Sequence, residues 1–211
     1  MMRKIVLATM NDNKIREIKE ILKDISGFLV SPKEFSIYEL PEESGSSYRE
    51  NALIKALYVC EKTNLPAIGE DSGLEIKFLN NEPGIYSSRY LGDISYEERM
   101  RLILDKMKNV EWEDRVAEFV CCLAIITPED KENPIFIEER VQGYINWEIK
   151  GNFGFGYDPI FYYPPLRKTF GELSNEDKNK ISHRTKAFLK AKEIIKNLIE
   201  EGNHEGSYFH R

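Results

Sequence analysis

The sequence predicts an α/β protein with a mixed central sheet, flanked by helices and divided into two lobes with a cleft between them. Apolar segments of strand character alternate along the chain with segments whose apolar residues recur at helical spacing, which is typical of this class. The first segment, residues 4–9, is a continuous apolar run, as expected for a strand covered on both faces. The pattern contains no internal repeat or Pro/Ser-rich linker. We therefore expect one domain over residues 1–202 and a polar tail over residues 203–211.

The individual elements follow from periodicity and capping signals. Two Ser-x-x-Glu stretches, Ser47–Glu50 and Ser95–Glu98, have the spacing of a capping box at the start of a helix. Residues 74–78 alternate between apolar and charged side chains, which predicts a half-buried strand. The predicted helices are residues 13–23, a helix after Ser47, residues 95–107 and a last helix from about residue 182; the predicted strands are residues 4–9, 28–31, 74–78, 115–127, 134–149 and 160–163.

Composition and charge limit the classes of partner. The 30 Lys and Arg residues are outnumbered by 36 Asp and Glu residues, so a net charge of −6 argues against binding to a nucleic-acid backbone. No signal peptide is recognisable and no apolar stretch approaches the roughly 18–20 residues that span a bilayer. The three cysteines have no metal or redox spacing, which indicates buried thiols in a reducing compartment. We expect a cytoplasmic protein with no nucleic-acid or membrane partner.

Cations stand at the starts of two predicted helices. Lys14 and Arg16 follow the polar loop 9–13, and His183 and Arg184 follow a candidate N-cap serine. A helix N-terminus carries partial positive charge, so a cation there is unfavourable. Solvent exposure would make the penalty small, whereas a bound anion such as phosphate would reverse it. Either explanation fits one site alone.

Two acidic pairs and a Gly-rich aromatic stretch complete the pattern. Glu70 and Asp71 lie in AIGEDSGL, and Glu42 and Glu43 lie in LPEESG. Each pair alone is explained by a turn or a solvated loop, but carboxylates are also the ligands that Mg²⁺ takes. The stretch 151–159, GNFGFGYDP, offers close backbone approach and aromatic faces for a base. Together with the cations, these features favour a metal-dependent nucleotide site.

Seven stretches together closely resemble the inosine triphosphate pyrophosphatase family. These enzymes hydrolyse non-standard purine nucleoside triphosphates to the monophosphate and pyrophosphate. The matching stretches run in the family's order from Leu7 to Arg184 and cover most of the chain; they are LATMNDNKIREI, LPEESG, YRENALIKA, AIGEDSGLEI, PGIYSSRYLG, FGYDPIF and KNKISHR.

The resemblance implies a reaction and a set of catalytic residues. ITP, dITP and XTP would be hydrolysed by water attack on the α-phosphorus, with Mg²⁺ as cofactor, in a homodimer whose active site lies in the cleft. Asp71, Glu70 and Lys14 would be catalytic, and Glu42 and Asp71 would bind the metal. A phosphatase that releases orthophosphate and a nucleotide sensor without turnover remain alternatives.

The resemblance also implies the substrate contacts. The triphosphate would be bound by the turn before the first helix, which comprises Thr9, Met10, Asn11, Asp12, Asn13 and Lys14. The nucleotide would be contacted by Ser72, and the base would be held by Phe155, Gly156, Tyr157 and Asp158. The 6-oxo purine edge would be contacted by Lys178, His183 and Arg184.

Overall fold

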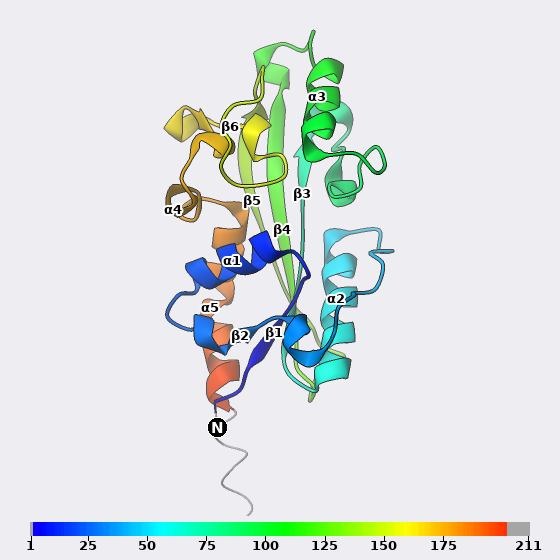
Figure 1. Cartoon of the computed structure of the whole chain (residues 1–211), viewed down its shortest axis with the longest axis vertical. Coiled ribbons are helices and arrows are strands. Elements are labelled where there is room, and N and C mark those ends of the chain that lie inside the picture. The colour runs from blue at the N-terminus through cyan, green and yellow to red at the C-terminus, as the bar shows by residue number, and fades with distance from the viewer. Residues whose placement is uncertain (1, 202–211) are drawn as a thin grey trace, which may run out of the picture. The chain divides into compact units, whose positions relative to one another are not determined.

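Seven strands form one mixed sheet in the computed structural model, which describes residues 2–201 (Figure 1). The strands are β1 (Ile5–Ala8), β2 (Leu29–Val30), β3 (Ala67–Ile76), β4 (Val116–Ile126), β5 (Ile135–Ile145), β6 (Phe161–Tyr163) and β7 (Lys168–Thr169), in the order β2-β1-β3-β4-β5-β6-β7. β1 pairs in parallel with β2 and β3, whereas β6 pairs antiparallel with β5 and β7. The mixed sheet predicted from the sequence is therefore confirmed.

The helices agree with the predicted ones, except that the short helix α4 was not predicted. They are α1 (Asp12–Ile21), α2 (Tyr48–Thr63), α3 (Tyr96–Lys106), α4 (Asn175–Lys178) and α5 (His183–Glu201). Both halves of the capping box form at Ser95 and Glu98. At α2 only one half forms, because Ser47 accepts the amide of Glu50 while the Glu50 carboxylate bonds to Ser46. The four-residue α4 and two-residue β7 were not predicted, since neither is long enough to show a period.

The chain divides into two compact units. The first unit comprises Met1–Asp71, Cys121–Glu138 and the chain from Arg184 onward, and the second comprises Ser72–Val120 and Glu139–His183. This division agrees with the two lobes expected from the sequence. The cleft between them stays a prediction, as does the single domain over residues 1–202, and the polar tail 203–211 lies outside the described residues.

In the first unit, β1 is covered on both faces by helices. Ile5 and Leu7 pack with α1 and α5, whereas Val6 and Ala8 pack with α2, which lies on the other side of β1 (Figure 1). All four side chains are at most 1% exposed, and burying a large aliphatic side chain contributes about 1.5–3 kcal/mol. This double coverage explains the continuous apolar run.

The second unit has its own core, in which aromatic rings pack among aliphatic side chains. Phe119 of β4 lies 4.5 Å from the ring of Phe161 and 5.8 Å from that of Phe170, measured between centroids. Met100 and Ile103 of α3 pack into the same cluster. The core fixes the base of the 151–159 loop, because Ile160 is also buried in it.

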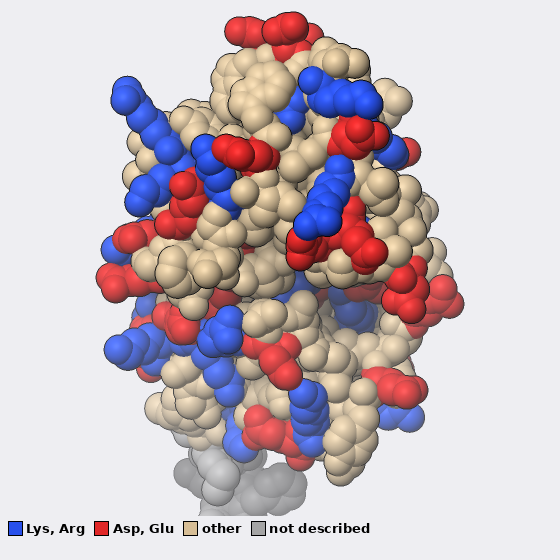
Figure 2. All heavy atoms as spheres, turned by 45° about the horizontal axis from the view of Figure 1, so that its top comes forward, with Lys and Arg blue, Asp and Glu red and all other residues tan. Residues whose placement is uncertain are grey.

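The structure shows how the charged side chains and the thiols are distributed. Basic and acidic side chains are interspersed over the face shown in Figure 2. All three cysteines are buried and free of disulfides, as predicted. Within residues 2–201, no helix combines the length and apolar character needed to cross a membrane.

Candidate active site

The acidic pair Glu70-Asp71 lies in the middle of a strand. β3 continues from Ala67 through Ile76, so the alternative of a turn at Asp-Ser-Gly is wrong. Successive strand residues point to opposite faces of a sheet. Glu70 accordingly shares a face with Ile68, which packs with α1 and α5, while Asp71 points toward α2. Neighbours in sequence thus enter different environments.

Glu70 belongs to a buried network of alternating charges. Nη2 of Arg184 donates to Oε1 of Glu70 at 2.9 Å, and Nη1 of Arg184 donates to Oε2 of Glu17 at 2.5 Å. Nζ of Lys14 lies 3.4 Å from Oε1 of Glu70. Burial alone would raise the pKa of Glu70, but the charges of Arg184 and Lys14 hold it well below its ordinary value. Glu70 is therefore ionised at neutral pH.

The same network explains the cation at the start of α5. The guanidinium of Arg184 is 1% exposed, and its anionic partners are two carboxylates of the chain itself. Neither solvent exposure nor a ligand anion is needed to offset the helix dipole there. Arg16, by contrast, is exposed and donates to Asn13, so solvent exposure is the explanation that holds for that residue.

Asp71 is held by two side chains of α2. Nδ2 of Asn51 donates to Oδ2 of Asp71 at 3.2 Å, and Nζ of Lys55 lies 3.5 Å from Oδ1. Lys55 also donates to Oε1 of Glu43 at 2.5 Å. Burial raises the pKa of Asp71, against the opposing charges of Lys55 and Lys14 and with a smaller contribution from Glu43. This carboxylate is more basic than an ordinary one.

The structure brings Glu43, rather than Glu42, toward Asp71. The side chain of Glu42 is exposed, while Glu43 is half-buried and shares the ammonium of Lys55 with Asp71. The sequence predicted Glu42 as the metal ligand of this loop, and that assignment stays a prediction. Loop residues carry no period that shows which side chain turns inward.

Three residues of this site were missed by sequence reasoning. Glu17, Asn51 and Lys55 are all at most 5% exposed and lie on helix faces that pack against the sheet. A polar residue at a position where the helical period requires an apolar one is the signal that would have found them. In YRENALIKA, Asn51 and Lys55 stand four residues apart on such a face.

The predicted triphosphate turn is an ordered helix start. The side chain of Asn11 caps α1 by accepting the amides of Asn13 and Lys14, and Oγ1 of Thr9 accepts the amide of Asn11. Met10 is half-buried, and Asp12 is exposed and paired with a lysine of the next segment. The turn thus brings Lys14 beside Glu70 at the N-terminus of a ten-residue helix, where an anion is favoured.

In the second unit, Asp158 organises the aromatic loop. Its Oδ2 accepts the amide of Phe155 at 2.8 Å and the ammonium of Lys178 at 2.5 Å. That ammonium lies 4.8 Å from the ring centroid of Phe155, within cation–π range. A Cβ at Gly154 would approach Oδ2 of Asp158 to 2.1 Å, and φ there is +72°, so a glycine is required. Gly156 also adopts a positive φ, +65°.

The remaining predicted residues of this unit differ in their exposure. Tyr157 is 3% exposed and donates its hydroxyl to the carbonyl of Ser87 at 2.9 Å, so its ring belongs to the core. The imidazole of His183 stacks on Phe119, 4.8 Å away between centroids. Ser72 and Phe155 are half-buried. The role of Phe155 as the ring on which the base stacks stays a prediction.

The donors in the first unit fit a hard divalent cation only in part. Among residues 2–201, no group of three or more His, Cys, Asp and Glu side chains is arranged to hold a metal ion. Glu43 and Asp71 do converge on one ammonium, and a cation that takes substrate oxygens and waters as its other ligands needs no more than two carboxylates. Glu43 and Asp71 therefore fit a Mg²⁺ ion whose other ligands are substrate oxygens and waters.

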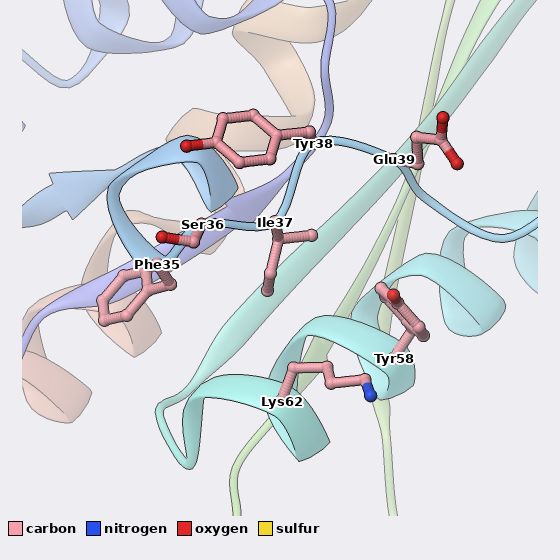
Figure 3. A pocket seen from close by; sticks show the side chains of 7 residues that line it. All are labelled: Phe35, Ser36, Ile37, Tyr38, Glu39, Tyr58 and Lys62. Atoms are coloured by element: carbon pink, nitrogen blue, oxygen red, sulfur yellow. The ribbon is translucent and has the colours of Figure 1, made fainter.

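A separate surface hollow of about 470 Å³ contains none of the predicted site residues (Figure 3). Its lining comes from the segment 35–39 and from Tyr58 and Lys62 of α2. With one lysine and one glutamate, Glu39, the hollow lacks the paired carboxylates and buried cations of the site described above.

Comparison with known proteins defines the class of this chain. The family model described as Ham1 family matches residues 5–194, and the chain belongs to this family. The resemblance drawn from the sequence is confirmed. The solved Ham1 protein of Coxiella burnetii matches with a TM-score of 0.84 and 39% identity, over 93% of this chain and all of that one. The Ham1 protein of Staphylococcus aureus matches with a TM-score of 0.80 and 37% identity, over 92% and 99% of the two chains.

Curated relatives carry a specific name. The dITP/XTP pyrophosphatase of Dictyoglomus thermophilum is 52% identical over 191 residues, which cover 90% of this chain and 93% of that protein. A dITP/XTP pyrophosphatase of Thermus thermophilus is 42% identical over 193 residues, or 92% of each chain.

Proposed function

We propose that this protein hydrolyses dITP, XTP and ITP to the nucleoside monophosphate and pyrophosphate. The names of its relatives support the substrate class, and the fold and the order of the sequence stretches support the family's chemistry. The observation that carries the proposal is the buried carboxylate of Asp71, held by Asn51 and Lys55 beside a second carboxylate. A nucleotide sensor has no need of a carboxylate with a raised pKa in such a setting.

The first unit supplies the phosphate and metal chemistry. Lys14 and the N-terminus of α1 bind the triphosphate, since both offer positive charge beside a polar turn. Glu43 and Asp71 would hold Mg²⁺, while Glu42, the ligand predicted from the sequence, stays a candidate in the same loop. When bound, the ion offsets phosphate charge in the transition state.

Asp71 acts as the general base. It orients a water molecule and accepts its proton as the oxygen attacks the α-phosphorus, so that pyrophosphate leaves. Lys55 and Asn51 fix the carboxylate for this step. Glu70 keeps its charge and holds Lys14 and Arg184 in place, which is a catalytic contribution through positioning.

The second unit recognises the base. Phe155 stacks on the purine, and Lys178, with its ammonium beside Asp158 and the Phe155 ring, donates to the carbonyl at C6. An ammonium has donors only, so it offers no acceptor to the amino group of adenine. A site built this way rejects the analogue that lacks the partner group. His183 packs beside this region and supports it.

The biological setting is part of the same proposal. We place the enzyme in the cytoplasm as a homodimer, where it removes non-canonical nucleotides from the pool. Residues 1–202 act as one catalytic domain. Gel filtration with light scattering tests the dimer directly.

Product analysis tests the chemistry. Wild type is incubated with dITP, XTP, ITP, ATP and GTP, with and without Mg²⁺, and pyrophosphate and orthophosphate are measured separately. Asp71→Asn is expected to lower kcat by about 10²–10⁴-fold, while Asp93→Asn, at an exposed carboxylate, leaves it unchanged. Orthophosphate as product would favour the phosphatase, and tight binding without turnover would favour the sensor.

A further inference from the structure

Asn51 is a fully buried amide on the face of α2 that packs against β3. Its side chain is 0% exposed among alanine and valine residues of the helix. A buried amide costs free energy unless both of its ends are hydrogen bonded. Here both ends are: Oδ1 accepts the amide of Gly45 at 2.9 Å, and Nδ2 donates to Oδ2 of Asp71 at 3.2 Å.

The two partners of Asn51 belong to separate segments of the site. Gly45 closes the acidic loop two residues after Glu43, and Asp71 lies on β3. One side chain therefore joins the loop that carries one carboxylate to the strand that carries the other. Lys55, one turn further along α2, connects the same two carboxylates through its ammonium.

The backbone around Asn51 leaves little room for a different spacing. A Cβ at Gly69 would lie 1.8 Å from the carbonyl oxygen of Ala52, so β3 and α2 approach as closely as a glycine allows. A Cβ at Gly45 would lie 2.7 Å from Oδ1 of Asn51. Both contacts set the distance that the amide has to bridge.

We propose that Asn51 is a positioning residue that sets the separation and orientation of Glu43 and Asp71, acting through the Gly45 amide on one side and the Asp71 carboxylate on the other. The role in catalysis rests on the proposed function. The amide occupies one oxygen of Asp71 and leaves Oδ1 to Lys55 and to the reaction. Residues that orient metal-binding or reacting groups in this way typically contribute about 10–100-fold to affinity or activity.

Two substitutions separate the two hydrogen bonds. Asn51→Asp keeps the shape and an acceptor for the Gly45 amide but removes the donor to Asp71. Asn51→Ala removes both bonds. Asn133→Asp is the matched control, because Asn133 also donates to an aspartate, at 2.9 Å, but on the exposed surface.

Activity and loop order are measured on the same preparations. Both Asn51 variants are expected to lose roughly 10–100-fold in kcat, with KM within about threefold of wild type, because binding of the nucleotide is retained while the reacting groups move. Amide hydrogen exchange in the loop 42–47 is expected to rise in Asn51→Ala and to stay near wild type in Asn51→Asp. Asn133→Asp changes neither quantity.

The outcomes distinguish the two proposals. If wild type releases pyrophosphate and Asn51→Asp keeps the wild-type kcat, the donor to Asp71 is irrelevant and the positioning role is overturned. It is overturned equally if Asn51→Ala leaves loop exchange unchanged. If wild type releases no pyrophosphate from any purine triphosphate, the proposed function fails. In that case, the affinity for Mn²⁺, measured by spectroscopy, still decides the positioning role. An affinity about tenfold weaker in Asn51→Ala than in wild type supports this role, and an unchanged affinity overturns it.

Discussion

Replacing Arg184 tests the buried charge network most directly. Arg184→Met keeps much of the length of the side chain but removes the guanidinium that pairs with Glu17 and Glu70. Both carboxylates are at most 3% exposed, so neither can turn to water without moving a helix or a strand. Removing one partner of a buried ion pair costs about 3–5 kcal/mol, because a charge is left uncompensated. A typical domain has only about 5–15 kcal/mol of unfolding free energy.

The measurement is urea unfolding at neutral pH, followed by far-UV circular dichroism and tryptophan fluorescence. Coincident transitions by the two probes are required before a free energy is derived. Arg101→Met serves as the control, because Arg101 pairs with Glu97 one turn away on the exposed face of α3. That substitution is expected to change stability by less than about 1 kcal/mol.

The effect has a definite pH dependence. The pKa of Glu70 is lowered in the folded protein from its ordinary value of 4.5. Its contribution is therefore fully present above about pH 4.5 and is lost as the pH falls toward the folded value. Arg184→Met removes the main cause of the lowering, so the stability gap to wild type is widest near pH 7 and narrows below about pH 4. A gap below about 1 kcal/mol at pH 7, or one that widens in acid, would refute the network as the source of stability.

Three further predictions follow from single contacts. Lys178→Met should reduce the ratio of kcat/KM for dITP over dATP by roughly 10–100-fold, since a hydrogen bond from a charged donor is lost; an unchanged ratio would remove Lys178 from base recognition. Gly69→Ala should prevent stable folding or lower the melting temperature steeply, because the new Cβ meets the carbonyl of Ala52. Gly27→Ala, where nothing lies within 4 Å, should be nearly neutral, and similar melting temperatures would contradict the close approach. The thiols should resist a disulfide reagent at pH 8 in the native state and react in urea. Burial raises the pKa of Cys122 to about 12, which leaves only about one thiolate in 10⁴ at that pH. Rapid reaction of the native protein would contradict the burial of this thiol.

Periodicity made most of the fold predictable from the sequence. β1, α1 and α3 were found within one or two residues because apolar side chains recur at the spacing that a covered strand or an amphipathic helix needs. The long strand β3 was only half found. Its first half contains Gly69 and the acidic pair, which are residue types typical of a turn. A strand could be predicted there only if the buried partners of the two carboxylates were known.

The sequence predicted which charged residues form the candidate site, but it did not predict the partners that hold them. The cations and carboxylates were recognised, yet their partners Glu17, Asn51 and Lys55 were not, because each stands at a core-facing position of a helix. The proximity of Glu43 to Asp71 could not be predicted for the same reason. Which side chain turns inward is decided by tertiary contacts such as the bond to Lys55, which leave no periodic trace in the sequence.

The strand geometry separates the two acidic neighbours into two functions. Because successive side chains of β3 point to opposite faces, Glu70 meets Arg184 and Lys14 while Asp71 meets Asn51 and one lysine. The pKa of the first carboxyl is lowered and that of the second is raised. Carboxyl groups whose pKa values are pushed apart by their surroundings take different parts in a reaction. This supports the proposal that Asp71 is the proton acceptor and that Glu70 is a fixed anion that keeps Lys14 in position. Two like charges side by side are therefore tolerable in a strand, since the sheet itself stands between them.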